Sequence, residues 1–227
     1  MDDTLGNGTI SEQLGDARSS RIYKTVAILL VLIVIMVSGF VYKILSPRVL
    51  TETELRINGA IVFNSPRSLG EFNLINEKGL AVNQELLKGQ WSLFFFGFTN
   101  CGYICPMTMA ELQRFYGMLD ESDRRSINIY LVSLDPSRDS PSAMQAYVTG
   151  FNENFKGLTG DFVQLRSLAG KVNLPMQKVT QADGSYDIDH GSNIALINPD
   201  GHYHGFFKSP IDPAKMKLAY RSIKAVY

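Results

Sequence analysis

The chain has few of the residues on which several common kinds of protein depend. It has only two cysteines, Cys101 and Cys105, so it is not a disulfide-rich scaffold. Only three histidines accompany them, which disfavours a structural zinc site with four closed ligands. The 22 basic residues equal the 22 acidic ones, so no overall charge attracts nucleic acid. No internal repeat or low-complexity tract is present, which excludes a repeat architecture.

What the chain does contain fits one globular domain with a membrane anchor. Residues Thr25–Tyr42 carry no charge and predict a transmembrane helix of about 18 residues, near the short end of what spans a bilayer. Lys24 and Lys43 bracket this run and can reach the two membrane interfaces. A cleavable signal peptide is the alternative, but the run is longer than a usual signal core and a long polar segment precedes it. We therefore expect a retained anchor.

The predicted organisation has four parts. Residues 1–24 are a polar tail without regular structure, 25–42 the anchor, 43–58 a linker, and 59–227 the globular domain. Basic residues flank both sides of the anchor equally, so charge does not decide its orientation. The tail is too acidic for a mitochondrial transit peptide. We expect a protein of the bacterial inner membrane with its soluble domain in the periplasm.

Dense apolar runs alternate with segments of helical periodicity, which predicts an α/β fold with a mixed sheet. The predicted strands are Trp91–Phe98, Ile127–Val132, Ile194–Ile197 and Tyr203–Phe207. The predicted helices follow Pro106, begin at Ser140-Pro141 and Asp212-Pro213, and run from Asp161 to Leu168.

The two cysteines lie where the first predicted strand meets a helix. Unpaired backbone N–H groups and the helix dipole at such a place favour an anionic thiolate, which is a nucleophile and a metal ligand. Because Cys101 and Cys105 are four residues apart, we expect both sulfurs on one helical face.

Three functions compete for this pair. A structural disulfide would close a short loop and stabilise the fold only weakly. A dithiol that exchanges with partner disulfides, in which a better exposed Cys101 attacks and Cys105 resolves, would make the protein a thiol–disulfide oxidoreductase. A soft metal site with two thiolates would select Cu(I) over zinc here. The position at a helix start favours the last two, and residue types alone leave both open.

His190 is the candidate for a third ligand. It lies in the polar segment Tyr186–Asn193, which we expect to be a loop that enters a core strand. A lone loop histidine is more often a surface residue than a ligand. Together with two thiolates, its imidazole would complete a site for Cu(I) or Cu(II), and Asp187 or Asp189 would orient the ring.

Other soft or basic side chains are expected to be structural. His202 and His204 share one face of a strand and are interpreted as an exposed hairpin edge, with a weak secondary copper site as the alternative. Met107 and Met109 lie near the cysteines and are interpreted as filling the helix core.

Four segments in order carry a resemblance to a known family. They are FFFGFTNCGYICP around the cysteines, SLDPSRD at 133–139, GLTG at 157–160, and Asp189-His190 followed by ALINPDG at 195–201. The chain resembles the Sco/SenC family of membrane-anchored, thioredoxin-fold copper proteins over nearly all of its soluble domain. Within 133–139, Asp135 and Arg138 are expected to form an ion pair that is buried or anchors the loop, with an outer-shell role near the copper loop as the alternative that spacing alone does not support.

The resemblance implies a thioredoxin-like mixed sheet flanked by helices and places Cys101, Cys105 and His190 on the copper ligands of the family. By the same resemblance, the protein would deliver copper to the binuclear copper site of cytochrome c oxidase, or reduce the cysteines of that site. The implied partner is the copper-bearing subunit of the oxidase or another copper or thiol protein. A periplasmic thiol–disulfide oxidoreductase without copper delivery is the alternative, and a peroxidase-like activity is a weaker one.

The chain departs from the family pattern T-H-C-P-D-x-C-P at three positions. Asn100, Gly102 and Tyr103 replace the histidine, the proline and the aspartate of that pattern. The departures change the charge beside the metal and the surface that a partner would meet, whereas the three ligands are intact.

Overall fold

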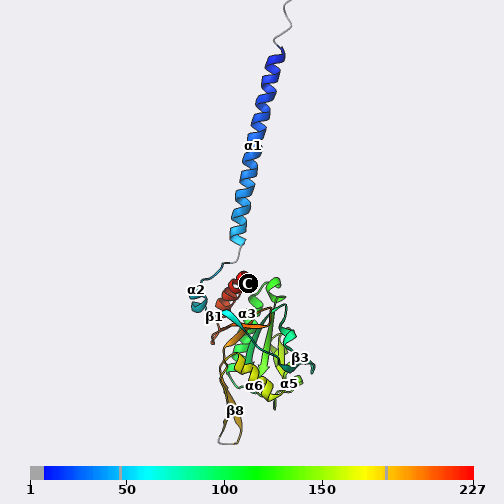
Figure 1. Cartoon of the computed structure of the whole chain (residues 1–227), viewed down its shortest axis with the longest axis vertical. Coiled ribbons are helices and arrows are strands. Elements are labelled where there is room, and N and C mark those ends of the chain that lie inside the picture. Colours follow the sequence, from blue (N-terminus) through cyan, green and yellow to red (C-terminus); the bar gives the residue numbers. More distant parts are fainter. Residues whose placement is uncertain (1–7, 46–47, 182–183) are drawn as a thin grey trace, which may run out of the picture. The chain divides into compact units, whose positions relative to one another are not determined.

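A single long helix dominates the N-terminal part of the chain (Figure 1). The computed structural model describes residues 8–45, 48–181 and 184–227, and the chain divides between Arg48 and Val49 into two units. In the first unit, α1 (Gly8–Leu45) contains Ile22–Ile44, which is 23 residues long and apolar enough to cross a membrane. At the rise of an α-helix this span measures about 34 Å, slightly more than the hydrocarbon core of a bilayer.

The helix is longer than the sequence predicts at both ends. The apolar span includes Lys24 and Lys43 near its ends, where long basic side chains can extend towards the interface. The helix also begins at Gly8, inside the tail for which we predicted no regular structure, so that prediction is wrong from Gly8 onward. The first seven residues of the tail lie outside the described part of the chain.

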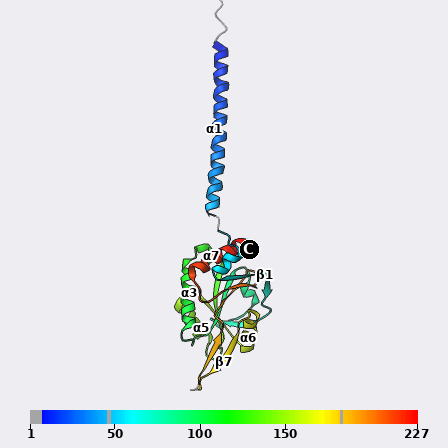
Figure 2. The ribbon, with the colours of Figure 1, turned by 90° about the vertical axis from the view of Figure 1, so that its left-hand side faces the viewer.

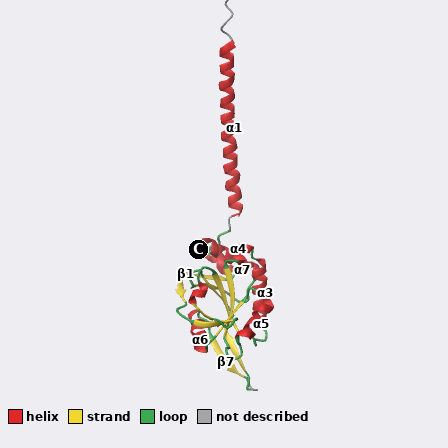
Figure 3. Cartoon of the chain, turned by 90° about the vertical axis from the view of Figure 1, so that its right-hand side faces the viewer, coloured by secondary structure: helices red, strands yellow, loops and turns green. Residues whose placement is uncertain are grey.

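The second unit, residues 49–227, is built around an eight-stranded mixed sheet (Figure 3). The strands lie in the order β1-β10-β9-β4-β5-β6-β2-β3, with β4, β5 and β6 parallel and all other neighbours antiparallel. Their bounds are β1 Ala60–Ser68, β2 Asn73–Asn76, β3 Ala81–Asn83, β4 Trp91–Gly97, β5 Ile127–Ser133, β6 Lys156–Thr159, β9 Ile194–Ile197 and β10 His202–Phe207. A separate hairpin pairs β7 (Met176–Thr180) with β8 (Tyr186–His190).

Helices cover both faces of the sheet, with α3 and α5 on one side and α6 on the other (Figures 2 and 3). The helix bounds are α2 Glu52–Ile57, α3 Ile104–Met118, α4 Glu121–Arg124, α5 Pro141–Phe151, α6 Phe162–Lys171 and α7 Pro213–Val226, with a 3₁₀ turn, η1, at Gln84–Leu87. The side chains of Ser140, Asp161 and Asp212 cap α5, α6 and α7, which confirms the three predicted helix starts.

Every residue of β4 is buried because both faces of this strand are covered. Leu93 and Phe95 point into the core beneath α3, α5 and α7. Phe94 and Phe96 point into the core beneath α6. The predicted α/β architecture is therefore confirmed, and the central strand ends at the place where the cysteines follow.

Two structural expectations are wrong. The segment 43–58, predicted to be a connector, contains α2, which begins with a capping box formed by Thr51 and Glu54. His202 and His204 do not lie on an exposed hairpin edge, because β10 is paired with β1 on one side and β9 on the other.

Candidate metal centre

Cys101 and Cys105 lie in the turn between β4 and α3. The backbone N–H of Cys101 donates to the carbonyl of Phe98 at 3.2 Å, which closes the turn after the strand. The helix begins at Ile104, so Cys105 lies in its first turn and Cys101 precedes it. The prediction that both cysteines share one helical face is therefore wrong, and the turn itself brings them together.

The two sulfurs form a reduced pair with unequal exposure. Both residues are free thiols, Cys105 is fully buried and Cys101 is partly exposed. The backbone N–H of Cys105 donates to Sγ of Cys101 at 3.3 Å, which places a helix N-terminal dipole against that sulfur. Burial, followed by the hydrogen bond with the Cys101 side chain, raises the pKa of the Cys105 thiol. Cys101 is therefore the sulfur that an incoming group meets first.

Gly97 makes this close approach possible. A Cβ atom at Gly97 would lie 2.9 Å from Sγ of Cys105, and 3.2 Å from a side-chain carbon of Leu131. Real Cβ atoms are not found at the first of these distances, so a larger residue at the end of β4 would displace the buried sulfur. The glycine in the FFFGFTNC segment thus has a steric role beside the dithiol.

His190 is the last residue of β8, not part of a loop as the sequence suggested. It is half-buried, and its ring packs edge-on against Phe98 with the ring centroids 6.0 Å apart. Its Nδ1 lies 2.8 Å from the carbonyl oxygen of Gly191. Because a carbonyl oxygen can only accept, this contact requires the proton on Nδ1, and the neutral form of the ring then presents the lone pair of Nε2 to a metal.

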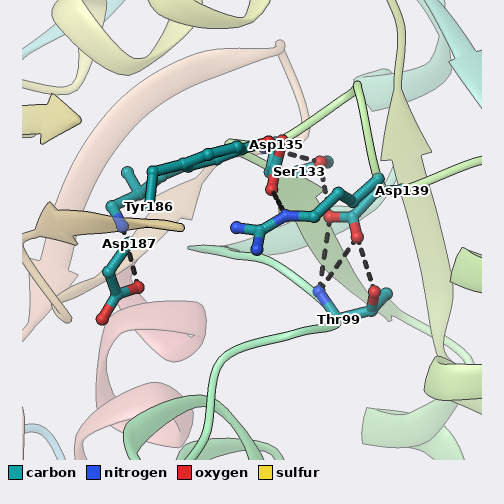
Figure 4. A network of polar contacts seen from close by, with 8 residues as sticks. Thr99, Ser133, Asp135, Asp139, Tyr186 and Asp187 are labelled. Atoms are coloured by element: carbon teal, nitrogen blue, oxygen red, sulfur yellow. Dashed lines mark hydrogen bonds and ion pairs between the residues drawn. The ribbon is translucent and has the colours of Figure 1, made fainter. Parts of the chain in front are cut away.

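The orienting partner of His190 is the backbone and not an aspartate. The carbonyl of Gly191 occupies the Nδ1 side of the ring, the role that the sequence suggested for Asp187 or Asp189. Both aspartates are exposed, and Asp187 accepts a hydrogen bond from the backbone N–H of Ile188 (Figure 4). A backbone acceptor holds the ring without adding negative charge.

The structure brings two of the three predicted ligands together. Within residues 8–45, 48–181 and 184–227, no group of three or more His, Cys, Asp or Glu side chains is arranged to hold a metal ion. Cys101 and Cys105 are adjacent, whereas His190 contacts Phe98 at the start of the cysteine turn. Two thiols and one imidazole with an available nitrogen are donors that suit copper.

The remaining candidate donors take no part in this arrangement. The ring of His204 packs against Trp91 and Tyr227, with centroid distances of 5.2 and 5.7 Å, and burial lowers its pKa. Met109 is fully buried in the helix core, as expected, whereas Met107 is 40% exposed.

A family model supplies the decisive comparison. The model described as SCO1/SenC matches residues 64–225, which cover the sheet except the first residues of β1, together with the cysteine turn and His190. The chain belongs to the SCO1/SenC family. A SCO2-like protein of Rickettsia conorii is 30% identical over 193 residues, which cover 84% of this chain and 93% of the relative.

Solved structures agree with this SCO1/SenC assignment and with a thioredoxin-like fold. The crystal structure of Arabidopsis thaliana ScoI with copper bound has a TM-score of 0.65 and 27% identity, and covers 70% of this chain and 98% of that one. The structure of Bradyrhizobium japonicum ScoI with copper bound has a TM-score of 0.58 and 31% identity, and covers 69% of this chain and 98% of that one.

A buried polar network supports the cysteine turn of this SCO1/SenC chain (Figure 4). Asp139 accepts hydrogen bonds from the backbone N–H of Thr99 at 3.1 Å, from the Thr99 hydroxyl at 2.6 Å and from the Ser133 hydroxyl at 2.7 Å. Burial raises the pKa of Asp139, and these donors oppose the rise. The predicted ion pair between Asp135 and Arg138 is confirmed.

Sequence reasoning did not anticipate the role of this network. Asp139 and Thr99 belong to two separate motifs, and their contact could not be predicted because it joins positions 40 residues apart. One signal in the sequence could have indicated it. A fully buried carboxylate rarely lacks a partner, so an aspartate that closely follows a core strand is a candidate to anchor a neighbouring loop by hydrogen bonds.

Exposed apolar side chains border the partly exposed sulfur. Tyr103 is 73% exposed, Ile104 46% and Met107 40%, and all three lie at the start of α3. Because these residues follow Cys101 closely in the chain, we expect a protein that reaches Cys101 to contact this apolar rim.

Proposed function

We propose that this chain binds copper through Cys101, Cys105 and His190 and passes it to a copper site during assembly of cytochrome c oxidase. The observation that carries the proposal is the reduced pair of adjacent sulfurs, one buried and one partly exposed, at the start of α3. Membership of the SCO1/SenC family and the copper in two related structures support copper as the metal. The recipient is the copper-bearing subunit of the oxidase.

The arrangement favours uptake and release by ligand exchange. Copper binding replaces the protons of the two thiols, so uptake releases protons to solvent. The raised pKa of Cys105 keeps that thiol protonated until the metal arrives. In transfer, a ligand of the recipient first takes the place of the exposed Cys101 sulfur, and the buried Cys105 leaves afterwards. Thiolate donors on both proteins keep the copper bound throughout.

The proposal is tested by measuring copper stoichiometry and affinity for the full chain in detergent. We expect one copper per chain, with a thiolate-to-copper charge-transfer band in the Cu(II) form. His190→Ala is expected to weaken Cu(II) binding and shift this band, because a nitrogen ligand is lost. His202→Ala is the matched control, since that half-buried histidine lies in β10 outside the site. An unchanged band and affinity in His190→Ala would refute the ligand assignment.

We also propose that the apolar span of α1 anchors the chain in a bacterial inner membrane with the copper site in the periplasm. The length and composition of Ile22–Ile44 support the anchor. The orientation is testable because Cys101 is the more exposed of only two cysteines. A membrane-impermeant maleimide should label the chain in intact spheroplasts, and Cys101→Ser should abolish the label. Labelling that requires lysis would place the domain in the cytoplasm.

A thiol–disulfide reductase is a second candidate, and the unequal exposure of the two sulfurs favours it. The Cys101 thiolate would attack a partner disulfide, forming a mixed disulfide and releasing one partner thiolate. Cys105 would then attack the Cys101 sulfur, closing an intramolecular disulfide and releasing the second partner thiolate, so two electrons pass to the partner. Cys105→Ser should trap the mixed disulfide, and His190→Ala should not affect its formation. Absence of any trapped species would remove this candidate.

A further inference from the structure

The β7–β8 hairpin, which carries His190, is weakly tied to the rest of the domain by packing. Within the described residues it pairs only with itself, and Ile188 is its single buried side chain. A cavity of about 510 Å³ lies beside Met176 and Ile188, between the hairpin and α6. A second cavity of about 250 Å³ borders Pro175 and Gly191 at the base of the hairpin. Apolar packing alone therefore leaves the position of His190 poorly fixed.

Polar contacts hold the β7–β8 hairpin against the rest of the domain. The Tyr186 hydroxyl donates to Oδ1 of Asp135 at 2.8 Å, so a residue of β8 is bonded to the loop after β5 (Figure 4). Nε of Arg138 bonds to the other oxygen of the same carboxylate. The Arg138 guanidinium also lies 4.2 Å from the centroid of the Tyr186 ring. Tyr186 of the hairpin is thus held by a hydrogen bond to Asp135 and a cation–π contact with Arg138, and these two residues form an ion pair with each other.

Arg138 connects the hairpin to the cysteine turn. Its guanidinium carbon lies 5.6 Å from the ring centroid of Phe98, the residue whose carbonyl accepts the N–H of Cys101. The same Phe98 ring packs against the ring of His190. Nη2 of Arg138 is buried and has no hydrogen-bond partner in the part of the chain that the structure describes, so the guanidinium keeps this stacked position despite one unsatisfied donor. One side chain therefore contacts both segments that carry the proposed ligands.

We infer that Asp135, Arg138 and Tyr186 form a clamp that positions the β7–β8 hairpin, and with it His190, against the cysteine turn. The clamp residues touch no ligand atom and act through the hairpin and Phe98, so they are positioning residues. The inference rests on the proposed function, because the position of His190 affects copper binding only if His190 is a copper ligand. Loss of a clamp contact should leave the dithiol intact and reduce the contribution of the His190 imidazole to copper affinity.

Two substitutions distinguish an effect of the clamp on copper binding from a general loss of stability. Tyr186→Phe removes the hydroxyl bond but keeps the ring, and Arg138→Gln removes the charge that stacks on it. The matched control for Tyr186→Phe is Tyr130→Phe, because the buried Tyr130 hydroxyl has no hydrogen-bond partner among the described residues. The matched control for Arg138→Gln is Arg166→Gln, which removes an exposed cation at the same cavity. We expect the clamp variants to bind Cu(II) about three- to ten-fold more weakly, and the controls to stay within about twofold of wild type.

The decisive comparison repeats Tyr186→Phe in a His190→Ala background. If Tyr186 acts by positioning His190, the substitution has no further effect on copper affinity once the imidazole is gone. The nitrogen hyperfine coupling in the Cu(II) electron paramagnetic resonance spectrum should weaken in Tyr186→Phe and stay unchanged in Tyr130→Phe. An equal loss of affinity in both backgrounds would overturn the inference.

A copper-free measurement distinguishes failure of the clamp from failure of the proposed function. Hydrogen exchange of the full chain in detergent should be faster at Met176–His190 in Tyr186→Phe than in wild type or Tyr130→Phe. If wild type binds no copper but exchange rises as expected, the proposed function fails and the clamp on the hairpin stands. Unchanged exchange in both clamp variants would overturn the clamp whatever the result with copper.

Discussion

At the scale of single residues, a difference in burial gives the chemically identical side chains of Cys101 and Cys105 different roles. Cys101 is reachable and receives a backbone N–H on its sulfur, whereas Cys105 is enclosed by β4 and α3. The sequence predicted the pair, its location and a better exposed first cysteine, but not the full burial of Cys105, because that burial depends on how the turn folds over Gly97. The accessible sulfur is suited to begin an exchange, and the enclosed sulfur to complete it.

The raised pKa of Cys105 predicts a pH dependence of stability. The unfolded thiol loses its proton near its ordinary value of 9.0, whereas burial keeps the folded thiol protonated at that pH. The unfolded state then binds fewer protons, so the free energy of unfolding falls as pH rises above about 9, by at most about 1.4 kcal/mol per pH unit. Below that value the group has no effect.

Urea unfolding of the reduced chain, measured between about pH 8 and about pH 10, checks this dependence. Cys105→Ala should show a shallower fall than wild type over the upper half of this range. Cys101→Ala is the control and should keep most of the fall that Cys105 causes, since burial, the largest cause of the raised pKa of Cys105, remains in that variant. Equal slopes for wild type and Cys105→Ala would contradict the account.

At the scale of elements, the start of α3 combines the dithiol with the apolar rim of Tyr103, Ile104 and Met107. A protein that exchanges copper or electrons with Cys101 must bury part of this rim, and buried apolar contacts contribute to binding. We predict that Met107→Ala leaves copper affinity unchanged but slows transfer to the copper-bearing domain of the oxidase about three- to ten-fold.

Met118 offers a matched control on the same helix. It is 43% exposed, close to the 40% of Met107, but lies at the opposite end of α3. Stopped-flow measurement of the transfer rate should therefore find Met118→Ala close to wild type. If the two variants transfer copper at the same rate, the rim is not the surface that the partner covers.

Elements whose burial follows a simple period were predictable from the sequence. The run at β4 predicted a doubly covered strand, and its alternate residues do enter two cores. The β7–β8 hairpin was not predictable, because β7 has no buried residue and β8 has only Ile188. β1 was missed for a related reason. It is an edge strand with Pro66 inside and an irregular register, so it lacks the pattern of a central strand.

The candidate site was predictable in its donors but not in its geometry. The three proposed ligands follow from chemistry and resemblance, since soft donors are few in this chain. The contacts that support them join segments far apart in sequence, such as Tyr186 with Asp135 and Thr99 with Asp139. No local pattern encodes such pairs, so one sequence alone did not reveal the clamp or the buried anchor.

At the scale of the whole molecule, the chain divides between Arg48 and Val49 into a unit that contains the apolar span of α1 and a unit that contains the cysteine turn. The sequence placed the domain boundary later, at residue 59. Leu50 is buried, and its backbone N–H donates to the Ser222 hydroxyl of α7 at 2.7 Å. We therefore propose that the stable domain begins before α2.

Two truncations test this boundary. We predict that 49–227 is soluble and binds copper as the full chain does, whereas 59–227 is less stable than 49–227 by about 2 to 4 kcal/mol, since burial of Leu50 and one hydrogen bond are lost. Urea unfolding of the two fragments under reducing conditions measures the difference. Equal stability would place the boundary at residue 59.

The central claim is that two sulfurs and one imidazole converge on a single copper ion, although the structure holds only the sulfurs together. X-ray absorption of the copper-loaded full chain tests it most directly, because sulfur and nitrogen scatterers around the metal are distinguishable. The account predicts two sulfur ligands and one imidazole nitrogen in wild type, with the nitrogen lost in His190→Ala and both sulfurs retained. An imidazole signal that persists in His190→Ala, or a site with fewer than two sulfurs in wild type, would contradict it.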